Sequence, residues 1–578
     1  MRQRLPKMLV VLLCLAVLAV GVWHKEGYHM DELLSFELAN ARFTPWIVPT
    51  QPEGRLEKFV KNEIEGDSAG ETFGNLAETV KDVLQNRGGS KMLSYKADVY
   101  EEPVWISAEE FREYITVDKG DDFQYLSVYF NVKDDNHPPV HFMLLHTMPS
   151  LWKGTVSPFL GCFINLVAVA GILILLMGLG RRLMGPEQGT ALGVLAALLY
   201  GLSAGAMATT LLIRMYALVA FFCVAFFFIH VQKWQEEAFG QKNKLLILVT
   251  VLGFLTQYFF LFYCLLLAAV TGVLLAASKR YKELFRYVRS MVTAAVIGVA
   301  LFPFSVSDVF SSGRGVEALN NLSEGFSGYG ARLKAFYQIL EGRTFGVLFT
   351  PLLLAALLLF WYAIFSKKPL WEQKQKGIWW MLCIPVPGYF LLVSRMSPYL
   401  VDRYMMPIFP FVILLVSALL MQGLAWLLPE RMAGRERGKQ AVILAVGGLL
   451  TIWQFAGILH YDGTYLYTGY AAQEAVARAY SDVPCICVYE GVGYYENLIE
   501  FTSYEKTLLV KPEELSQRRD KESVTSLDRV VVLLKPGVDD AGIAQTMQEE
   551  YGFTLEKWLF LESVHGDRAA LFTKATAD

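Results

Sequence analysis

The sequence is poor in charge and has no excess of either sign. Charged residues make up 19% of its 578 residues, and the formal net charge is −3. Lys and Arg gather in short groups between apolar runs instead of following one helix face, so they form no basic surface of the kind that binds nucleic acid. We therefore expect no nucleic-acid partner.

Cysteine is also scarce, and its spacing gives no disulfide framework and no C-x-x-C metal motif. Five of the seven cysteines lie within apolar runs, where cysteine serves as a small hydrophobic residue: Cys14, Cys162, Cys223, Cys264 and Cys383. Cys485 and Cys487 fall in one predicted strand. They could form a redox-active pair, but two strand residues that face the same core is the favoured interpretation.

A dinucleotide-binding fingerprint is missing as well. Gly491 and Gly493 follow a predicted strand, but the third glycine of the pattern is absent, which favours an ordinary turn. The sequence shows no internal repeat and no low-complexity segment. It therefore gives no indication of a nucleotide site or of a repeat architecture.

Hydrophobic residues, by contrast, make up 54% of the chain, and the mean hydropathy is +0.36. A helix needs about 20 apolar residues to cross a bilayer. Runs near this length predict eleven spans, at residues 8–23, 158–180, 189–208, 211–231, 245–258, 259–277, 291–307, 346–365, 378–394, 405–428 and 441–459. Only Gln257 separates the fifth span from the sixth. The first run follows three basic residues and has no signal-peptide cleavage site, so we interpret it as a retained anchor.

Basic residues mark one side of the membrane. Short loops rich in Lys and Arg face the cytoplasm, and here they lie at the N-terminus and at 181–182, 233–244, 279–289, 367–376 and 431–439. The N-terminus is then cytoplasmic and, after an odd number of spans, the C-terminal tail is extracytoplasmic. Loop 24–154, the loop at about 308–345 and the turn 395–403 are predicted to lie outside.

Two polar parts accompany the spans. Residues 24–154 predict a large folded loop with juxtamembrane helices, which we assign to a membrane domain of residues 1–459. Residues 460–578 form a second domain, with helical patterns at 471–480 and 540–551 and strands at 483–488, 530–534, 558–560 and 570–572. Strands that alternate with helices indicate a small α/β domain.

Two adjacent carboxylates, Asp31 and Glu32, follow the first span in the segment His29–Ser35. A partly desolvated carboxylate near the membrane surface could accept a proton from a hydroxyl group. The alternative is a solvated acidic first turn of a helix, which the helix dipole favours. These residues by themselves favour the alternative, because a two-residue motif is common.

A proline-rich motif, His137-Pro138-Pro139, precedes a short apolar helix that is predicted to lie at the membrane interface. His137 and His141 are four residues apart, a spacing that metal sites use, but no Glu completes a zinc-protease pattern. We therefore favour a structural or hydrogen-bonding role for these histidines over a metal site.

Three arginines, Arg214, Arg395 and Arg403, stand at the predicted outer ends of spans. Arginine at membrane depth is costly unless it is paired or solvated, and its guanidinium group matches the oxygens of a phosphate. The alternative for each is extension of the side chain to the interface, with a local pair between Asp402 and Arg403.

These features together resemble glycosyltransferases of the GT-C fold, especially bacterial relatives of the protein O-mannosyltransferases and the lipid A aminoarabinose transferase (glycosyltransferase family 39-like). Those enzymes carry a His-x-Asp-Glu-type motif after the first span, a His-Pro-Pro-aromatic helix before the second and an Arg-Tyr-x-x-Pro turn late in the bundle. This sequence has His29–Glu32, His137–Phe142 and Arg403–Pro407 in that order. The resemblance extends to about residue 430, and Val140 and His141 replace the more usual Leu-Tyr.

The resemblance implies an inverting hexosyl- or pentosyltransferase that uses a polyprenyl-phosphate sugar donor at the outer membrane surface. It implies Asp31 as general base, and we assign Glu32 to acceptor or donor contacts. The donor phosphate would be bound by Arg214, Tyr216, Arg395, Arg403, Tyr404 and His137. The acceptor could be a protein, a lipid or a cell-wall polymer. There is no metal motif, and a requirement for a divalent cation stays open.

Two other functions remain: a transporter or flippase of lipid-linked sugars, and an inactive family member that acts as a scaffold. Transporters often show internal symmetry and small loops, so the large first loop and the lack of a repeat favour the enzyme. We expect an all-α polytopic membrane protein of GT-C-like fold with about eleven transmembrane helices. A large first outer loop and a C-terminal extracytoplasmic α/β domain complete it.

Overall fold

The computed structural model describes residues 4–185, 188–310, 316–317, 320–322, 328–365, 373–427 and 436–574. Chain packing divides the protein into two compact units. We call the first the helical unit; it comprises Met1–His24, Asp134–His141 and Gly161–Thr464. We call the second the sheet unit; it comprises Lys25–Lys133, Phe142–Leu160 and Tyr465–Asp578.

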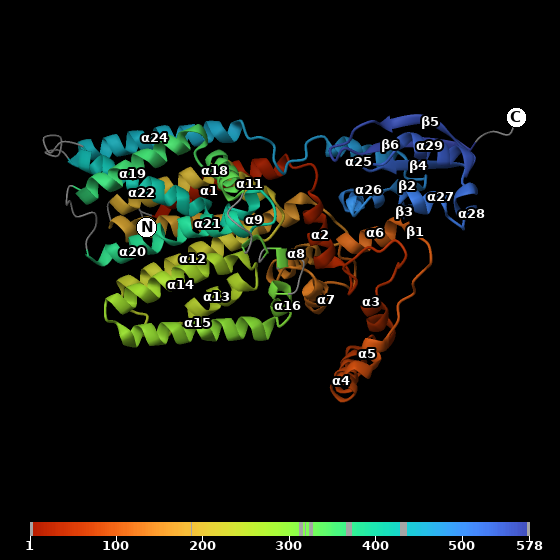
Figure 1. Cartoon of the computed structure of the whole chain (residues 1–578), viewed down its shortest axis with the longest axis horizontal. Coiled ribbons are helices and arrows are strands. Elements are labelled where there is room, and N and C mark those ends of the chain that lie inside the picture. The colour runs from red at the N-terminus through yellow and green to blue at the C-terminus, as the bar shows by residue number, and fades with distance from the viewer. Residues whose placement is uncertain are drawn as a thin grey trace. The chain divides into compact units, whose positions relative to one another are not determined.

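The helical unit is a bundle of long apolar helices that lie side by side (Figure 1). Its helices are α1 (Arg4–Trp23), α9 (Pro158–Met184), α10 (Gln188–Gly201), α11 (Ala204–Leu211), α12 (Tyr216–Gln235), α13 (Lys244–Phe254), α14 (Phe259–Ala277), α15 (Tyr281–Leu301), α16 (Ser305–Phe310), α18 (Tyr329–Arg343), α19 (Phe349–Phe365), α20 (Gln373–Cys383), α21 (Pro385–Met396), α22 (Phe409–Leu427) and α24 (Glu436–Leu459). Short 3-10 turns at Gly346–Leu348, Asp402–Tyr404 and Met406–Ile408 connect some of them.

Seven helices of the described residues are long and apolar enough to cross a membrane, or nine if each of two bent pairs counts as one span. The chain is therefore a multi-pass membrane protein. The expected break at Gln257 is present, because α13 ends at Phe254 and α14 begins at Phe259. The count of eleven is not confirmed, since α13 and Leu444–Leu459 are shorter apolar helices. The predicted span 189–208 is a pair, α10 and α11, bent by 59°.

The C-terminal part of the sheet unit has the α/β character that the sequence predicts. Its strands are β2 (Cys485–Val488), β3 (Lys506–Val510), β4 (Arg529–Leu534), β5 (Phe553–Phe560) and β6 (Arg568–Lys574). Its helices are α25 (Tyr470–Ala479), α26 (Leu498–Phe501), α27 (Pro512–Ser516), α28 (Glu522–Thr525) and α29 (Asp540–Glu549). β2 is parallel to β3 and β4, and the remaining pairings are antiparallel. The sequence pattern does not predict strand β3.

The two cysteines of β2 are core residues. Cys485 and Cys487 are fully buried, and burial raises the pKa of both thiols. Because the thiolate is the reactive form, this environment suits the interpretation as core residues better than a redox-active pair. Ile486 and Val488, on the other face of the strand, belong to the main hydrophobic core.

The first polar loop packs with the tail, which differs from the division drawn from the sequence. Its elements are α2 (Met30–Asn40), α3 (Arg55–Phe59), a π-helical turn (Val60–Ile64), α4 (Ala69–Asn86), α5 (Lys91–Ser94), β1 (Trp105–Ser107), α6 (Ala108–Ile115), α7 (Tyr125–Asn131) and α8 (Val140–Leu151). β1 pairs antiparallel with β3 and completes a six-stranded sheet of order β1-β3-β2-β4-β6-β5. Strand β1, which lies within the predicted membrane domain 1–459, therefore shares a sheet with the tail.

Candidate functional site

The site residues expected from the sequence divide between the two units. Asp31 and Glu32 belong to the sheet unit, whereas Arg214, Tyr216, Arg395, Arg403, Tyr404 and His137 belong to the helical unit.

The Asp-Glu pair forms the first turn of α2. His29 is the N-cap residue, and its Nδ1 accepts the backbone N–H of Asp31 at 3.0 Å. Glu32 Oε2 accepts the backbone N–H of His29 at 2.7 Å, which completes a capping box. Two carboxylates at the positive end of the helix dipole are locally favourable. The sequence therefore starts α2 at this point and fixes both carboxylates to it.

The two carboxylates have different environments. The Glu32 side chain is 0% exposed and pairs with Lys25, whose Nζ lies 3.0 Å from Glu32 Oε2. The Asp31 side chain is 20% exposed, and its Oδ2 lies 3.6 Å from His29 Nδ1. The Glu32 carboxylate is therefore fully buried, while the Asp31 side chain remains partly exposed. The buried Glu32 carboxylate accepts from Lys25 Nζ and from the backbone N–H of His29.

In the helical unit, His137 lies between the carboxylate of Asp135 and the guanidinium group of Arg214. Its Nδ1 is 2.8 Å from Asp135 Oδ2, and its Nε2 is 3.4 Å from Arg214 Nη2. A guanidinium group only donates, so Arg214 faces Nε2 as a donor, while the Asp135 carboxylate faces Nδ1 as an acceptor. Burial would raise the pKa of Asp135, but His137 and Arg214 outweigh burial and hold that pKa below its usual value. Asp135 is thus an anion that orients His137.

Arg214 lies at the break between α11 and α12 and is only 6% exposed. His141, one turn into the segment that follows His137, is fully buried. Burial, together with the charges of Arg214 and His137, lowers the pKa of His141 to about 3, so its ring is neutral. Among the described residues, no three His, Cys, Asp or Glu side chains come close enough to share a metal ion.

The two predicted tyrosines meet in an aromatic cluster. Tyr404 stacks on Phe259 with ring centroids 4.8 Å apart, and Tyr216 meets Tyr404 edge-on at 6.3 Å. The guanidinium carbon of Arg403 lies 5.7 Å from the Tyr404 ring. Arg214 and Tyr216 are two residues apart in the chain. The α11–α12 break therefore positions both Arg214, which contacts His137, and Tyr216, which belongs to the aromatic cluster.

Arg395 contacts a different set of residues. Its guanidinium carbon lies 5.5 Å from the Tyr329 ring, and its Nη2 lies 3.5 Å from the Leu322 carbonyl oxygen. Asp402, for which the sequence suggested a local pair with Arg403, accepts from Arg343 Nε of α18 at 2.8 Å. The α18 helix therefore fixes the turn that carries Arg403.

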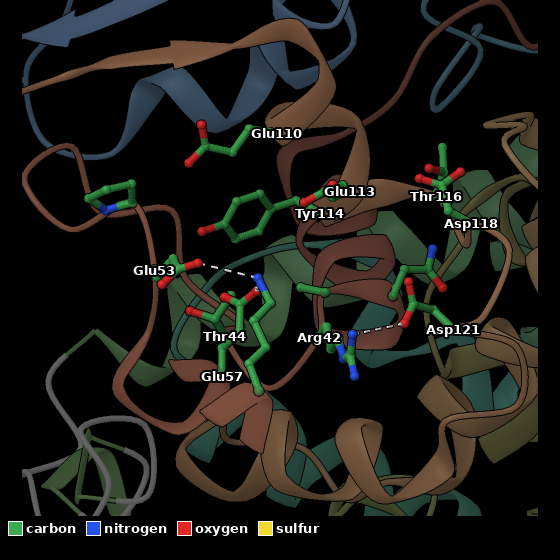
Figure 2. A pocket seen from close by; sticks show the side chains of 14 residues that line it. Arg42, Thr44, Glu53, Glu57, Glu110, Glu113, Tyr114, Thr116, Asp118 and Asp121 are labelled. Atoms are coloured by element: carbon green, nitrogen blue, oxygen red, sulfur yellow. Dashed lines mark hydrogen bonds and ion pairs between the residues drawn. The ribbon is translucent and has the colours of Figure 1, made fainter. Parts of the chain in front are cut away.

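A polar pocket of about 370 Å³ lies within the sheet unit, beyond the C-terminal end of α2 (Figure 2). It is lined by six carboxylates, from Glu53, Glu57, Glu110, Glu113, Asp118 and Asp121, and by two basic residues, Arg42 and Lys61. Arg42 pairs with Asp121, and Lys61 pairs with Glu53 and Glu57. Burial is the main cause that raises the pKa of Glu57, Glu110, Glu113 and Asp121.

Three polar contacts of the helical unit, Asp135–His137, Tyr258–Asp308 and Arg343–Asp402, are not predicted by the sequence patterns. Asp135 stands two residues before His137 and could have been found as its neighbour. Tyr258, which donates to Asp308 at 2.7 Å, and Arg343 carry no motif of their own. Their roles depend on contacts between helices that are far apart in the sequence.

Comparisons with known proteins give the fold. No family model matches the chain, and no curated protein matches it. The crystal structure of ArnT from Cupriavidus metallidurans bound to undecaprenyl phosphate is similar over 99% of this chain and 98% of that one, with a TM-score of 0.50 and 12% identity. The apo structure of the same protein matches with a TM-score of 0.41 and 11% identity, over 79% of this chain and 94% of that one. The GT-C-like fold expected from the sequence is confirmed.

Proposed function

We propose that this protein is a membrane glycosyltransferase that transfers a sugar from a polyprenyl-phosphate donor to an extracytoplasmic acceptor, with inversion. The similar ArnT structure contains undecaprenyl phosphate. The observation that carries the proposal is the buried Arg214 at a helix break, next to His137, which also contacts Asp135. A charged side chain buried among apolar helices marks a candidate functional site, and the guanidinium fork matches the oxygens of the phosphate that this donor carries.

Asp31 is the general base in this proposal. As the acceptor hydroxyl oxygen forms its bond to the anomeric carbon, the proton passes to the Asp31 carboxylate. The bond between the anomeric carbon and the phosphate oxygen breaks, and its electron pair leaves with the polyprenyl phosphate. Attack from the face opposite the leaving group inverts the configuration. Glu32 does not touch the substrates and instead helps to hold the first turn of α2.

Arg214 and Arg403 bind the phosphate of the donor and stabilise the charge that gathers on it as the bond breaks. Arg395 is a weaker candidate, because it stacks on Tyr329 and contacts the Leu322 carbonyl. Tyr216 and Tyr404 form an aromatic surface beside Arg403. In the proposed orientation the N-terminus is cytoplasmic and the sheet unit is extracytoplasmic.

The test uses purified full-length protein with short-chain polyprenyl-phosphate sugars and measures release of polyprenyl phosphate. General-base assistance is worth about 10²–10⁴-fold, so Asp31→Asn should lower kcat by that order. The matched control Asp67→Asn, at an exposed position in the same unit, should leave kcat unchanged. Binding of undecaprenyl phosphate is measured in parallel. Wild-type protein that neither binds undecaprenyl phosphate nor releases it from any donor would refute the proposal. Transfer of intact lipid-linked sugar across vesicles would indicate a flippase.

A further inference from the structure

The segment that leads into α2 is bound to the first residues of the tail. Glu26 N–H donates to the Leu466 carbonyl oxygen at 2.9 Å, and Gly469 N–H donates to Glu26 Oε2 at 2.6 Å. Lys25 Nζ donates to the Tyr465 carbonyl oxygen at 2.6 Å. We call these two segments, Lys25–Gly27 and Tyr465–Gly469, the clasp.

The tail side of the clasp has a strained backbone. Tyr465 and Tyr467 have φ values of 69° and 54°, in the left-handed region that side chains rarely adopt. They are two of six such non-glycine residues in the described part of the chain. Strain of this kind persists only where the surrounding structure fixes it, and it is concentrated at functional sites. In the clasp it directs the Tyr465 and Leu466 carbonyl groups toward Lys25 and Glu26.

The clasp is also closely packed. A Cβ atom on Gly27 would lie 2.6 Å from Tyr470 Cγ and 2.9 Å from Tyr467 Cβ, so no larger residue fits there without a shift. Tyr470 is buried and donates from its hydroxyl to Glu500. The tail side is thereby tied to the interior of the sheet unit.

The Lys25–Glu32 ion pair joins the clasp to α2. Both side chains are 0% exposed, and Lys25 binds Glu32 and the Tyr465 carbonyl together. Burying an ion pair costs desolvation energy that its attraction often only balances, so we assign this pair a role in the local geometry and not in stability. Glu32 is the direct neighbour of Asp31 and caps the same turn.

We propose that the clasp positions Asp31 for catalysis, with Lys25 and Glu32 as positioning residues that balance the charge beside it. This rests on the proposed function, in which Asp31 is the general base. It also gives the tail a role in the reaction, since its Tyr465–Gly469 segment holds the start of α2.

Charged and titratable groups from several elements lie around this turn. His29 and Glu32 come from the cap and first turn of α2, and Lys25 and Glu26 come from the preceding segment. His565, from the β5–β6 loop, packs against Tyr467 and Tyr470 and interacts electrostatically with His29. Of these, only Lys25 and Glu32 form an ion pair buried to 0% exposure. Removing one member should leave the charge of the other acting on Asp31.

The first test measures the acidic limb of the profile of kcat/KM against pH, which reports the ionisation of the free base. Lys25→Met leaves the Glu32 anion and should move this limb to higher pH by about one unit. Glu32→Gln leaves the Lys25 cation and should move it to lower pH by about as much. The Lys25→Met, Glu32→Gln double variant should return near the wild-type position. Loss of folding alone would not produce opposite displacements. Displacements in the same direction, or none, would overturn the proposal.

The second test does not depend on catalysis. Gly27→Ala should separate the clasp and increase backbone hydrogen exchange in α2 at least tenfold. Gly70→Ala, whose added Cβ meets nothing within 4 Å, is the matched control. Unchanged exchange in α2 of Gly27→Ala would refute the clasp whatever the activity. If Asp31→Asn keeps normal turnover while exchange responds as expected, the clasp stands as a device that holds α2 and the proposed base is wrong.

Discussion

Glu500 should make the stability of the sheet unit depend on pH in the direction opposite to most carboxylates. This residue of α26 is 3% exposed and accepts from the Tyr470 hydroxyl and the Gln473 amide. Burial disfavours its anion and raises its pKa from 4.5 to about 7, although these hydrogen bonds partly oppose the rise. Between the two values the folded protein binds more protons than the unfolded chain. Stability is then complete below the unfolded pKa and falls as the pH rises through 7.

A rise from 4.5 to about 7 corresponds to a loss of about 3 kcal/mol between pH 4 and pH 8. Glu500→Gln keeps the size of the side chain and removes its charge, so it should abolish this loss and stabilise the sheet unit at pH 8. The assay is hydrogen exchange of β2 and β4 peptides in the full-length protein across a pH series, corrected for intrinsic exchange rates. Glu505→Gln, at an exposed position nearby, is the control. An equal pH slope in wild type and Glu500→Gln would refute the reasoning.

Three further predictions concern the pocket, the phosphate site and the topology. The raised pKa values of Glu57 and Asp121 predict that hydrogen-exchange protection of the pocket helices increases as the pH falls from neutral toward the ordinary pKa of a free carboxyl group; protection that decreases would contradict this. Arg214→Lys keeps the charge but loses the guanidinium fork, so undecaprenyl phosphate should bind about tenfold more weakly, and unchanged affinity would remove Arg214 from the site. An impermeant thiol reagent should label Glu556→Cys in intact cells, but Lys282→Cys only after permeabilisation. The described native cysteines are buried or partly buried, so they should add little background labelling. The reverse pattern would invert the proposed topology.

The sequence alone determined the membrane class, the positions of most apolar helices and the α/β character of the tail. These properties follow from local patterns, since apolar runs of span length and strands that alternate with helices need no knowledge of distant residues. The start of α2 also follows from a local pattern, because His29 and Glu32 form a capping box within four residues. The motifs that resemble GT-C enzymes also pointed to the fold that the ArnT comparison supports.

Contacts between distant parts of the chain determine which of the two adjacent carboxylates is buried. Lys25 forms a buried ion pair with Glu32 and also donates to the carbonyl of Tyr465, 440 residues away. The contact between Arg214 and His137 spans 77 residues, and β1 pairs with a strand of the tail. No local pattern encodes such pairs, because whether two distant polar groups meet depends on how the elements between them pack.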